Sequence, residues 1–250
     1  MDQETAFLKK RLTDLSKRAE QKNIVTFSHF LNLNELNILH QSERELHSSF
    51  ETFGGYEQAE RQMAAFIPDA LSYVWEYPIR TVMLAPLHRK FAEDLTHRDV
   101  LGALIHLGVK REMLGDLLLL ENGIYVFCAD AVADYLSDNC TRIRHTSVAA
   151  KQISMQEFHY EPKRIEKEGI VSSFRLDTIL ADICKLSRSA AQKLISEGNA
   201  FINAKKILQN DYPCQEGDIL SVRHYGKFQI QSAGQKTKKG RIKYRYDIYA

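Results

Sequence analysis

The sequence lacks the features that would place it in a membrane or an oxidising compartment. No apolar run reaches the roughly 18 residues that a membrane-spanning helix needs. The N-terminus, MDQETAFLKKRL, has acidic residues before its basic ones and no apolar core, which predicts that there is no signal peptide. Cys128, Cys140, Cys184 and Cys214 are far apart and form no C-x-x-C pair, so we expect free, buried thiols in a reducing cytoplasm.

Recognisable catalytic motifs are missing as well. The histidines are scattered, without an H-E-x-x-H motif or a cysteine–histidine spacing that would hold zinc. No G-x-G-x-x-G or G-x-x-x-x-G-K-S/T sequence indicates a nucleotide site. His97-Arg98-Asp99 resembles a kinase catalytic loop, but there is no D-F-G motif, so we interpret Asp99 as a helix cap. The sequence predicts no catalytic residue, metal, cofactor or small-molecule substrate.

Charge is distributed unevenly along the 250 residues, although the net charge is only +2. Residues 1–159 hold 17 Lys and Arg against 22 Asp and Glu, whereas residues 160–250 hold 17 against 10, so the net charges are −5 and +7. From Arg223 to Tyr246 there are eight basic residues and no acidic one. A basic C-terminal third is typical of nucleic-acid binding; the alternative is a charged tail that keeps the protein soluble.

The fold class predicted is α+β, with three small domains. Residues 1–76 read as a helix to about residue 22, a helix capped by Asn34, and strands on either side of a Gly54-Gly55 break. Glu60-Arg61 after this break could line a site, but a turn held by an ion pair is the interpretation we favour.

Residues 77–154 follow the order β-α-β-β-α-β, which predicts a ferredoxin-like sheet of the kind that RNA-recognition modules use. Along the strand Gly123–Ala129, Tyr125 and Phe127 share one face because side chains alternate. These two rings either stack on RNA bases or belong to the core, and the pattern leaves both open.

Residues 155–171 are highly charged and predict an exposed linker, and residues 172–250 predict two amphipathic helices followed by β-hairpins. Ser187 is a good cap for the second helix. Arg188 lies in the first turn of that helix and opposes the helix dipole, so we expect a phosphate near it. The end of the chain reads as a mobile loop over 232–240 and a strand from Arg241 to Tyr249.

Two short motifs in this last region are similar to those of a known domain family. Arg-Leu-Asp at residues 175–177 opens the first helix, and Ser-Arg-Ser at residues 187–189 opens the second. With the apolar strand that ends at Arg223, the segment resembles the S4 RNA-binding domain. It departs from that pattern at Ala204, where the family usually has glycine, and at Phe201, which replaces a smaller β-branched residue.

The stretches GGYEQAERQMAAF and LTHRDVLGALIHLGVKREMLGD extend the resemblance to the whole chain, which is similar to the YlmH family of bacterial RNA-binding proteins. This resemblance implies a cytoplasmic, ribosome-associated protein that contacts ribosomal RNA of the large subunit, with contact to peptidyl-tRNA left open. It also implies a link to the rescue of stalled translation and a genomic association with cell-division genes.

The predicted RNA-binding site is a basic patch on the S4-like domain with polar residues among the cations. Removing one cation that contacts a phosphate should flatten the salt dependence of binding by about one unit. The residues are Arg175, Ser187, Arg188, Ser189, Gln192, Lys193, Asn203, Lys205, Lys206, Arg223, Lys227, Lys238, Lys239 and Arg241.

Two other functions remain as alternatives. S4 domains often accompany pseudouridine synthases, which need an aspartate on a catalytic loop, but Asp177 lies inside the first helix and is better explained by a local pair with Arg175 or Arg188. A protein adaptor of the division machinery, docking through the acidic N-terminal domain, is the other alternative.

Overall fold

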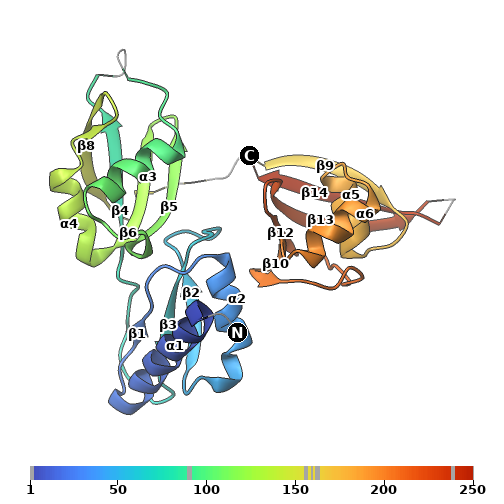
Figure 1. The fold of residues 1–250 in the computed structure, drawn as a ribbon, viewed down its shortest axis with the longest axis horizontal. Helices are drawn as coiled ribbons and strands as arrows, with labels where there is room; N and C mark the ends of the chain where they lie inside the picture. Colours follow the sequence, from blue (N-terminus) through green and yellow to red (C-terminus); the bar gives the residue numbers. More distant parts are fainter. Residues whose placement is uncertain are drawn as a thin grey trace. The chain divides into compact units, whose positions relative to one another are not determined.

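The computed structural model describes residues 3–88, 92–154, 157–158, 160, 164–237 and 240–249. The chain divides into two units, Met1–Tyr160 and Glu161–Ala250 (Figure 1). The first unit contains both of the domains predicted over residues 1–154, so the predicted boundary at residue 76 lies inside it. The arrangement is mixed helix and sheet throughout, which confirms the α+β fold class.

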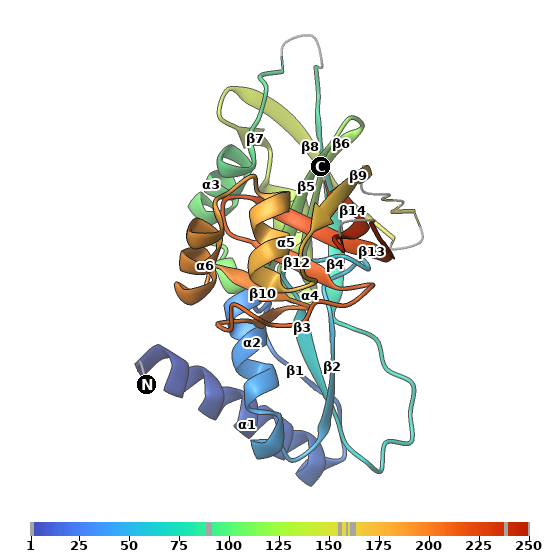
Figure 2. The same ribbon diagram turned by 90° about the vertical axis from the view of Figure 1, so that its right-hand side faces the viewer.

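A three-stranded antiparallel sheet of order β1-β3-β2 opens the first unit, and α1 lies along one of its faces (Figure 2). Leu12, Leu39 and Phe66 are buried between helices and sheet. The sequence predicted Asn34 as the cap of α2, but the cap is Asn32. The Asn32 side chain accepts the N–H groups of Asn34 and Glu35, and the Glu35 carboxylate accepts the Asn32 N–H. The elements are α1 Gln3–Lys22, β1 Thr26–Phe27, α2 Leu33–Gln41, β2 Ser49–Phe53 and β3 Met63–Ile67.

The second half of this unit contains the predicted β-α-β-β-α-β order. Its sheet has the order β5-β6-β4-β8-β7, in which the first strand of the motif lies between the third and the fourth. Val100 and Leu104 of α3 and Leu136 of α4 pack on the face that carries Val82 and Val126. The elements are β4 Ile79–Pro86, α3 His97–His106, β5 Leu114–Leu120, β6 Gly123–Ala129, α4 Asp130–Asn139, β7 Arg142–Ile143 and β8 Thr146–Ile153.

The predicted cap of α3 needs correction. Thr96 is the N-cap, and its hydroxyl accepts the Asp99 N–H while the Asp99 carboxylate accepts the Thr96 N–H. Asp99 is therefore the third helical residue of a capping box. Gly108 follows the helix with φ at +87°, as expected for a residue that ends it.

The second unit is a six-stranded antiparallel sheet of order β11-β10-β12-β13-β14-β9, with α5 and α6 side by side on one face (Figure 1). Four apolar residues of α5, predicted from their helical spacing, are buried there: Leu176, Ile179, Leu180 and Ile183. The elements are β9 Arg164–Val171, α5 Leu176–Ile183, α6 Arg188–Ser196, β10 Ala200–Ile202, β11 Lys205–Lys206, β12 Ile219–Val222, β13 Gly226–Lys236 and β14 Ile242–Tyr249.

Two sequence predictions are wrong at the edge of this sheet. The predicted linker over 155–171 becomes the strand β9 from Arg164, which pairs with β14 along its whole length. The predicted mobile loop over 232–240 is β-strand as far as Lys236. β13 continues to pair with β14 over this stretch, with two shifts of the register. The predicted site residues Lys238 and Lys239 lie outside the described residues.

No helix in the described part of the chain is long and apolar enough to cross a membrane. All four cysteines are free, as predicted, and three of them are buried, Cys184 being partly exposed. Burial raises the pKa of Cys214 to about 12, so this thiol is inert at neutral pH.

Candidate nucleic-acid interface

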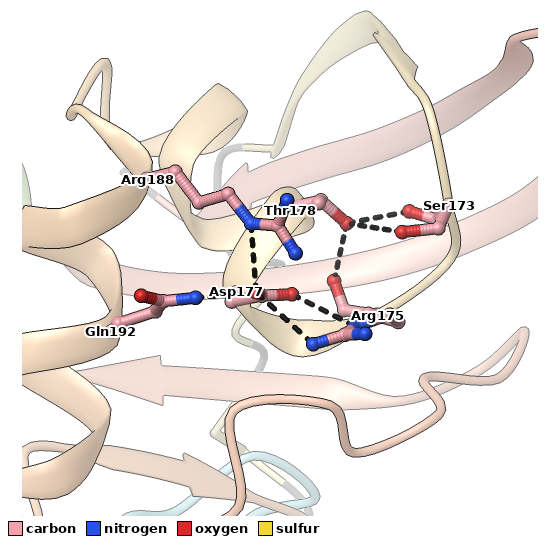
Figure 3. A network of polar contacts seen from close by, with 6 residues as sticks. All are labelled: Ser173, Arg175, Asp177, Thr178, Arg188 and Gln192. Atoms are coloured by element: carbon pink, nitrogen blue, oxygen red, sulfur yellow. Dashed lines mark hydrogen bonds and ion pairs between the residues drawn. The ribbon is translucent and has the colours of Figure 1, made fainter.

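A buried carboxylate organises the corner between α5 and α6. Asp177 lies in the first turn of α5 with no exposed side-chain surface. Its Oδ2 accepts the Nε–H of Arg188 and the side-chain N–H of Gln192, both at 3.0 Å. Arg175 donates from Nε and Nη2 to the two carboxylate oxygens at 3.2 and 3.3 Å. Three predicted site residues therefore converge on one acidic side chain (Figure 3).

The ionised form of Asp177 is the stable one in this setting. Burial alone would raise its pKa, but the hydrogen bonds from Gln192 and Arg188 and the charge of Arg175 outweigh burial and lower the pKa below its ordinary value. The position in the first turn of α5 adds the favourable field of a helix N-terminus. The predicted local pair of Asp177 is thus confirmed, and with both arginines at once.

Asp177 supplies from within the chain the anion that offsets the charge of Arg188 at the start of α6, so no phosphate is required for that purpose. The expected phosphate near Arg188 stays a prediction. The side chain of Arg188 is nevertheless 57% exposed, and that of Arg175 is 38% exposed. Of the nitrogens of Arg188, only Nε bonds to Asp177 in the described structure. The guanidinium is planar and carries five N–H donors, so its outer edge can still receive a phosphate.

Ser187 is confirmed as the cap of α6, since its Oγ accepts the Ala190 N–H at 3.2 Å. The hydroxyls of Ser187 and Ser189 are 3.0 Å apart and both side chains are exposed. Lys193, one turn further along, is 77% exposed and lies 3.8 Å from Glu197. An exposed pair at that distance is weak, so Lys193 remains available to an external anion.

Cations also gather near the other end of α6. The Arg223 N–H donates to the carbonyl of Asn199, which follows the helix. A Cβ at Gly198 would lie 3.2 Å from Cδ of Lys206, so the chain of this lysine runs over the end of the helix. Arg223 and Lys205 are exposed, and in the described structure neither side chain forms an ion pair.

Asn203 has a structural role that the sequence did not predict. Its side-chain N–H donates to Asp218 at 2.9 Å and its amide oxygen accepts the Ile219 N–H at 3.0 Å. Asn203 and Ala204 have φ of +49° and +63° in the two-residue turn between β10 and β11. Both residues of such a tight hairpin turn need positive φ, which explains why the S4 pattern favours glycine where Ala204 stands.

The remaining predicted cations lie on or beside the open face of the sheet, opposite α5. Lys227 pairs in register with Ser221 and Tyr249, one residue out of phase with the buried Phe228. Its Nζ lies 5.6 Å from the ring centroid of Tyr249. Arg241 is exposed immediately before β14. Lys227 therefore belongs to a different face from Arg188.

Acidic residues of β9 balance the basic strand β14. As predicted, Lys243 and Arg245 are exposed while Tyr244 and Tyr246 point into the core. Nζ of Lys243 lies 2.8 Å from Glu168, and Nη1 of Arg245 lies 3.4 Å from Glu166. The basic C-terminal stretch is therefore partly neutralised by the segment that the sequence analysis took for a linker.

Comparisons with known proteins identify the family of the chain and two of its domains. The family model described as "Putative RNA-binding domain in YlmH" matches residues 76–157, and the S4 domain model matches residues 174–220. A relative from Bacillus subtilis (strain 168), "Ribosome-associated protein quality control protein P2", is 30% identical over 190 residues, which cover 74% of this chain and 72% of the relative. The chain belongs to the YlmH family. RNA-binding domains thus occupy both units of this YlmH-family chain.

A solved structure, "Cell division protein ylmH from Streptococcus pneumoniae", aligns with a TM-score of 0.51 at 19% identity. It covers 63% of this chain and 95% of the solved chain. At this level of identity the likeness concerns the fold, and it supports the mixed helix and sheet architecture of the YlmH family.

Base stacking on Tyr125 and Phe127 is excluded by their burial, and the core interpretation is the right one. Phe127 is fully buried and Tyr125 is 6% exposed. Phe158 packs on both rings, at centroid distances of 5.0 and 5.2 Å. Gly55, at φ +103°, lies so close that a Cβ there would clash with the Phe127 ring. The face of the YlmH domain that would read bases in an RNA-recognition module is thus covered by its own chain.

Proposed function

We propose that this protein binds structured RNA of the large ribosomal subunit through the α5–α6 corner, and that it acts in ribosome-associated quality control by binding. The observation that carries the proposal is the buried Asp177 carboxylate, which holds two arginines in fixed positions while leaving their outer edges exposed. Donors fixed in advance lose less conformational entropy when a phosphate binds.

The arrangement suits phosphate recognition. Arg188 and Lys193 project from one short helix, and the Arg188 and Ser189 N–H groups lie at its N-terminus, where backbone donors favour anions. Contacts of this kind fix the orientation of a protein on RNA without reading sequence. The ribosome-associated relative supports RNA of the ribosome as the partner class. Large-subunit RNA, peptidyl-tRNA as a further candidate, and a cytoplasmic location are the finer parts of this proposal.

A pair of matched double variants tests the proposal. Arg188→Gln with Lys193→Gln removes two cations from the α5–α6 corner, and Lys243→Gln with Arg245→Gln removes two from the open face of the same unit. Affinity for a labelled RNA stem of about two turns is measured between 50 and 200 mM salt. We expect the first pair to lower affinity and to reduce the salt slope by about two units, since each phosphate contact contributes about one.

The second pair should change the slope by clearly less, because these cations lie on another face from Arg188 and the carboxylates of Glu168 and Glu166 beside them lower the local positive potential. Equal effects of the two pairs would mean that overall charge and not the corner controls binding. Unchanged affinity and slope in the first pair would contradict the proposed site. Thermal melting of each variant establishes that it is folded.

Co-sedimentation of the full chain with purified large ribosomal subunits tests the partner. We expect the first double variant to dissociate at lower salt than the unaltered protein. Retention of both variants at all salts would instead favour docking through the first unit, as an adaptor would do. A change in the nucleoside composition of the bound RNA would support the pseudouridine synthase alternative.

A further inference from the structure

The turn between β12 and β13 exposes an aromatic ring that packing does not account for. Tyr225 is 41% exposed, and among the described residues of the second unit it is the only phenylalanine or tyrosine in the exposed class. Phe174, Tyr244 and Tyr246 have ring contacts in the core, and Tyr249 lies beside two cations. In the described structure Tyr225 has no ring contact and no hydrogen bond to its hydroxyl.

The backbone holds this ring in a defined place. The Tyr225 N–H donates to the Val222 carbonyl at 3.1 Å, and the Arg223 N–H donates to Asn199 at 3.0 Å. These two bonds tie the turn to its own strand and to the segment that follows α6. His224 has φ of +67°, the left-handed conformation that a short hairpin loop uses. The anchored turn therefore presents the exposed Tyr225 ring at its tip.

The charge around Tyr225 favours a polyanion as the partner. Arg223, two residues before it, is exposed and forms no ion pair in the described structure. From Arg223 to Tyr246 the sequence has no acidic residue. Every nucleobase has a flat face that can stack on an aromatic ring, whatever its identity.

We propose that Tyr225 stacks on an unpaired nucleobase of the bound RNA while Arg223 contacts the adjoining phosphate. This inference rests on the proposed function and adds a ligand class to it, namely RNA with a bulged or looped nucleotide next to a helical stem. Base stacking, which the sequence leaves open for Tyr125 and Phe127 in the first unit, is thereby proposed for a turn of the second unit.

Two RNA duplexes of the same sequence test this inference, one fully paired and one with a single unpaired 2-aminopurine in its centre. The full chain is compared with Tyr225→Ala and with Tyr225→Phe, which keeps the ring and removes the hydroxyl. Stacking on an aromatic ring contributes about 1–3 kcal/mol per base, so Tyr225→Ala should weaken binding of the bulged duplex about 5- to 150-fold. Tyr225→Phe should stay within about twofold, because the ring does the stacking.

The unaltered protein should quench the 2-aminopurine fluorescence, and Tyr225→Ala should not. The salt slope should be the same for all three proteins, because no charge is changed. Equal affinity of the unaltered protein and Tyr225→Ala for the bulged duplex would overturn the inference, as would a loss that appears only in co-sedimentation with ribosomes, which would indicate a protein contact.

Failure of this inference is distinguishable from failure of the proposed function. If Arg188→Gln with Lys193→Gln lowers affinity and salt slope for the paired duplex while Tyr225→Ala changes neither, the proposed site at the α5–α6 corner is supported and the stacking site is contradicted. If neither duplex binds the unaltered protein, both proposals are contradicted.

Discussion

Two aspartates, one in each unit, gather donors around a carboxylate in different ways. Asp116 of β5 accepts the Tyr56 hydroxyl at 2.8 Å and the N–H groups of Glu60 and Arg61 at 2.7 and 3.1 Å. Asp177 of α5 accepts mainly charged side chains. The first carboxylate ties the loop between β2 and β3 to β5, whereas the second fixes cations at a surface.

The arginines beside the two carboxylates differ in the same way. Arg61 donates from Nε to the Leu114 carbonyl and from Nη2 to the Phe30 carbonyl, both at 3.0 Å, and is partly buried. Arg111 lies close by, and burial, followed by the charge of Arg61, lowers its pKa to about 10. Arg188 donates one N–H to Asp177, and the rest of its guanidinium is exposed. An arginine whose N–H groups bond to backbone carbonyls therefore has a structural role, whereas an arginine held only at its inner edge can also bind a ligand.

Phe127→Ala should have the largest effect on stability, because it removes a fully buried ring that packs against Tyr56 and Phe158 in the first unit. We expect a loss of about 3–5 kcal/mol in the free energy of unfolding, as for other buried phenylalanines. Urea unfolding followed by the fluorescence of Trp75, the one tryptophan of the chain, measures it. RNA affinity under folding conditions should be unchanged, and a selective loss of affinity in a fully folded variant would restore base stacking on β6.

Asp177→Asn and Asp116→Asn compare the two carboxylates directly. Each should cost about 1–3 kcal/mol of stability, because buried donors lose a charged acceptor. Only Asp177→Asn should weaken RNA binding, several-fold, although it makes the protein more positive. The change in net charge alone predicts tighter RNA binding. Tighter binding of the RNA stem by Asp177→Asn would therefore show that fixed guanidinium positions are unimportant.

Acid should act on the second unit through Asp177. Its folded-state pKa lies below that of the unfolded chain, about 3.9, so the stabilisation is complete above the unfolded value and is lost as pH falls through the folded one. Amide hydrogen exchange of α5 and α6 between pH 6 and 3 measures this loss. Asp177→Asn should show a flatter pH dependence, and an unchanged one would assign acid sensitivity to other groups.

Ala204→Gly should have the smallest effect and the opposite direction. Glycine relieves the left-handed strain of about 1–2 kcal/mol but gains freedom in the unfolded chain, so we expect a net stabilisation of about 0.5–1 kcal/mol. Hydrogen exchange of β10 and β12 reports it. Destabilisation would indicate that the methyl group of Ala204 makes a contact that outweighs the strain.

The parts of the fold with a strong apolar period were predictable from the sequence. The buried face of α5 and the strands β4, β6 and β14 lie where the pattern predicted them. The strand β9 was missed because its sequence, RIEKEGIV, is charged and buries only Gly169 and Val171, so an edge strand resembled a linker. The cap at Thr96 was signalled by an acidic residue three positions later, the spacing of a capping box, which the interpretation of Asp99 as the cap overlooked.

The candidate site was predictable in its residue types and in the pairing of Asp177 with Arg175 or Arg188. Spacing along α6 does not tell that both arginines bond to Asp177 at once, or that Gln192 joins them. The division of the cations between two faces depends on strand register, which places Lys227 opposite Tyr249. Tyr225 gave no periodic signal because it lies in a turn.

The pairing of β9 with β14 has a consequence for dissecting the protein. The S4 model match begins at residue 174, after β9 has ended, so a fragment cut at that point would leave β14 as an unpaired edge. An exposed strand of eight residues that carries several tyrosines can recruit a second copy edge to edge. Self-association of such a fragment would reflect the missing strand, because the compact unit at this end of the chain includes the acidic strand β9 that precedes the recognised domain.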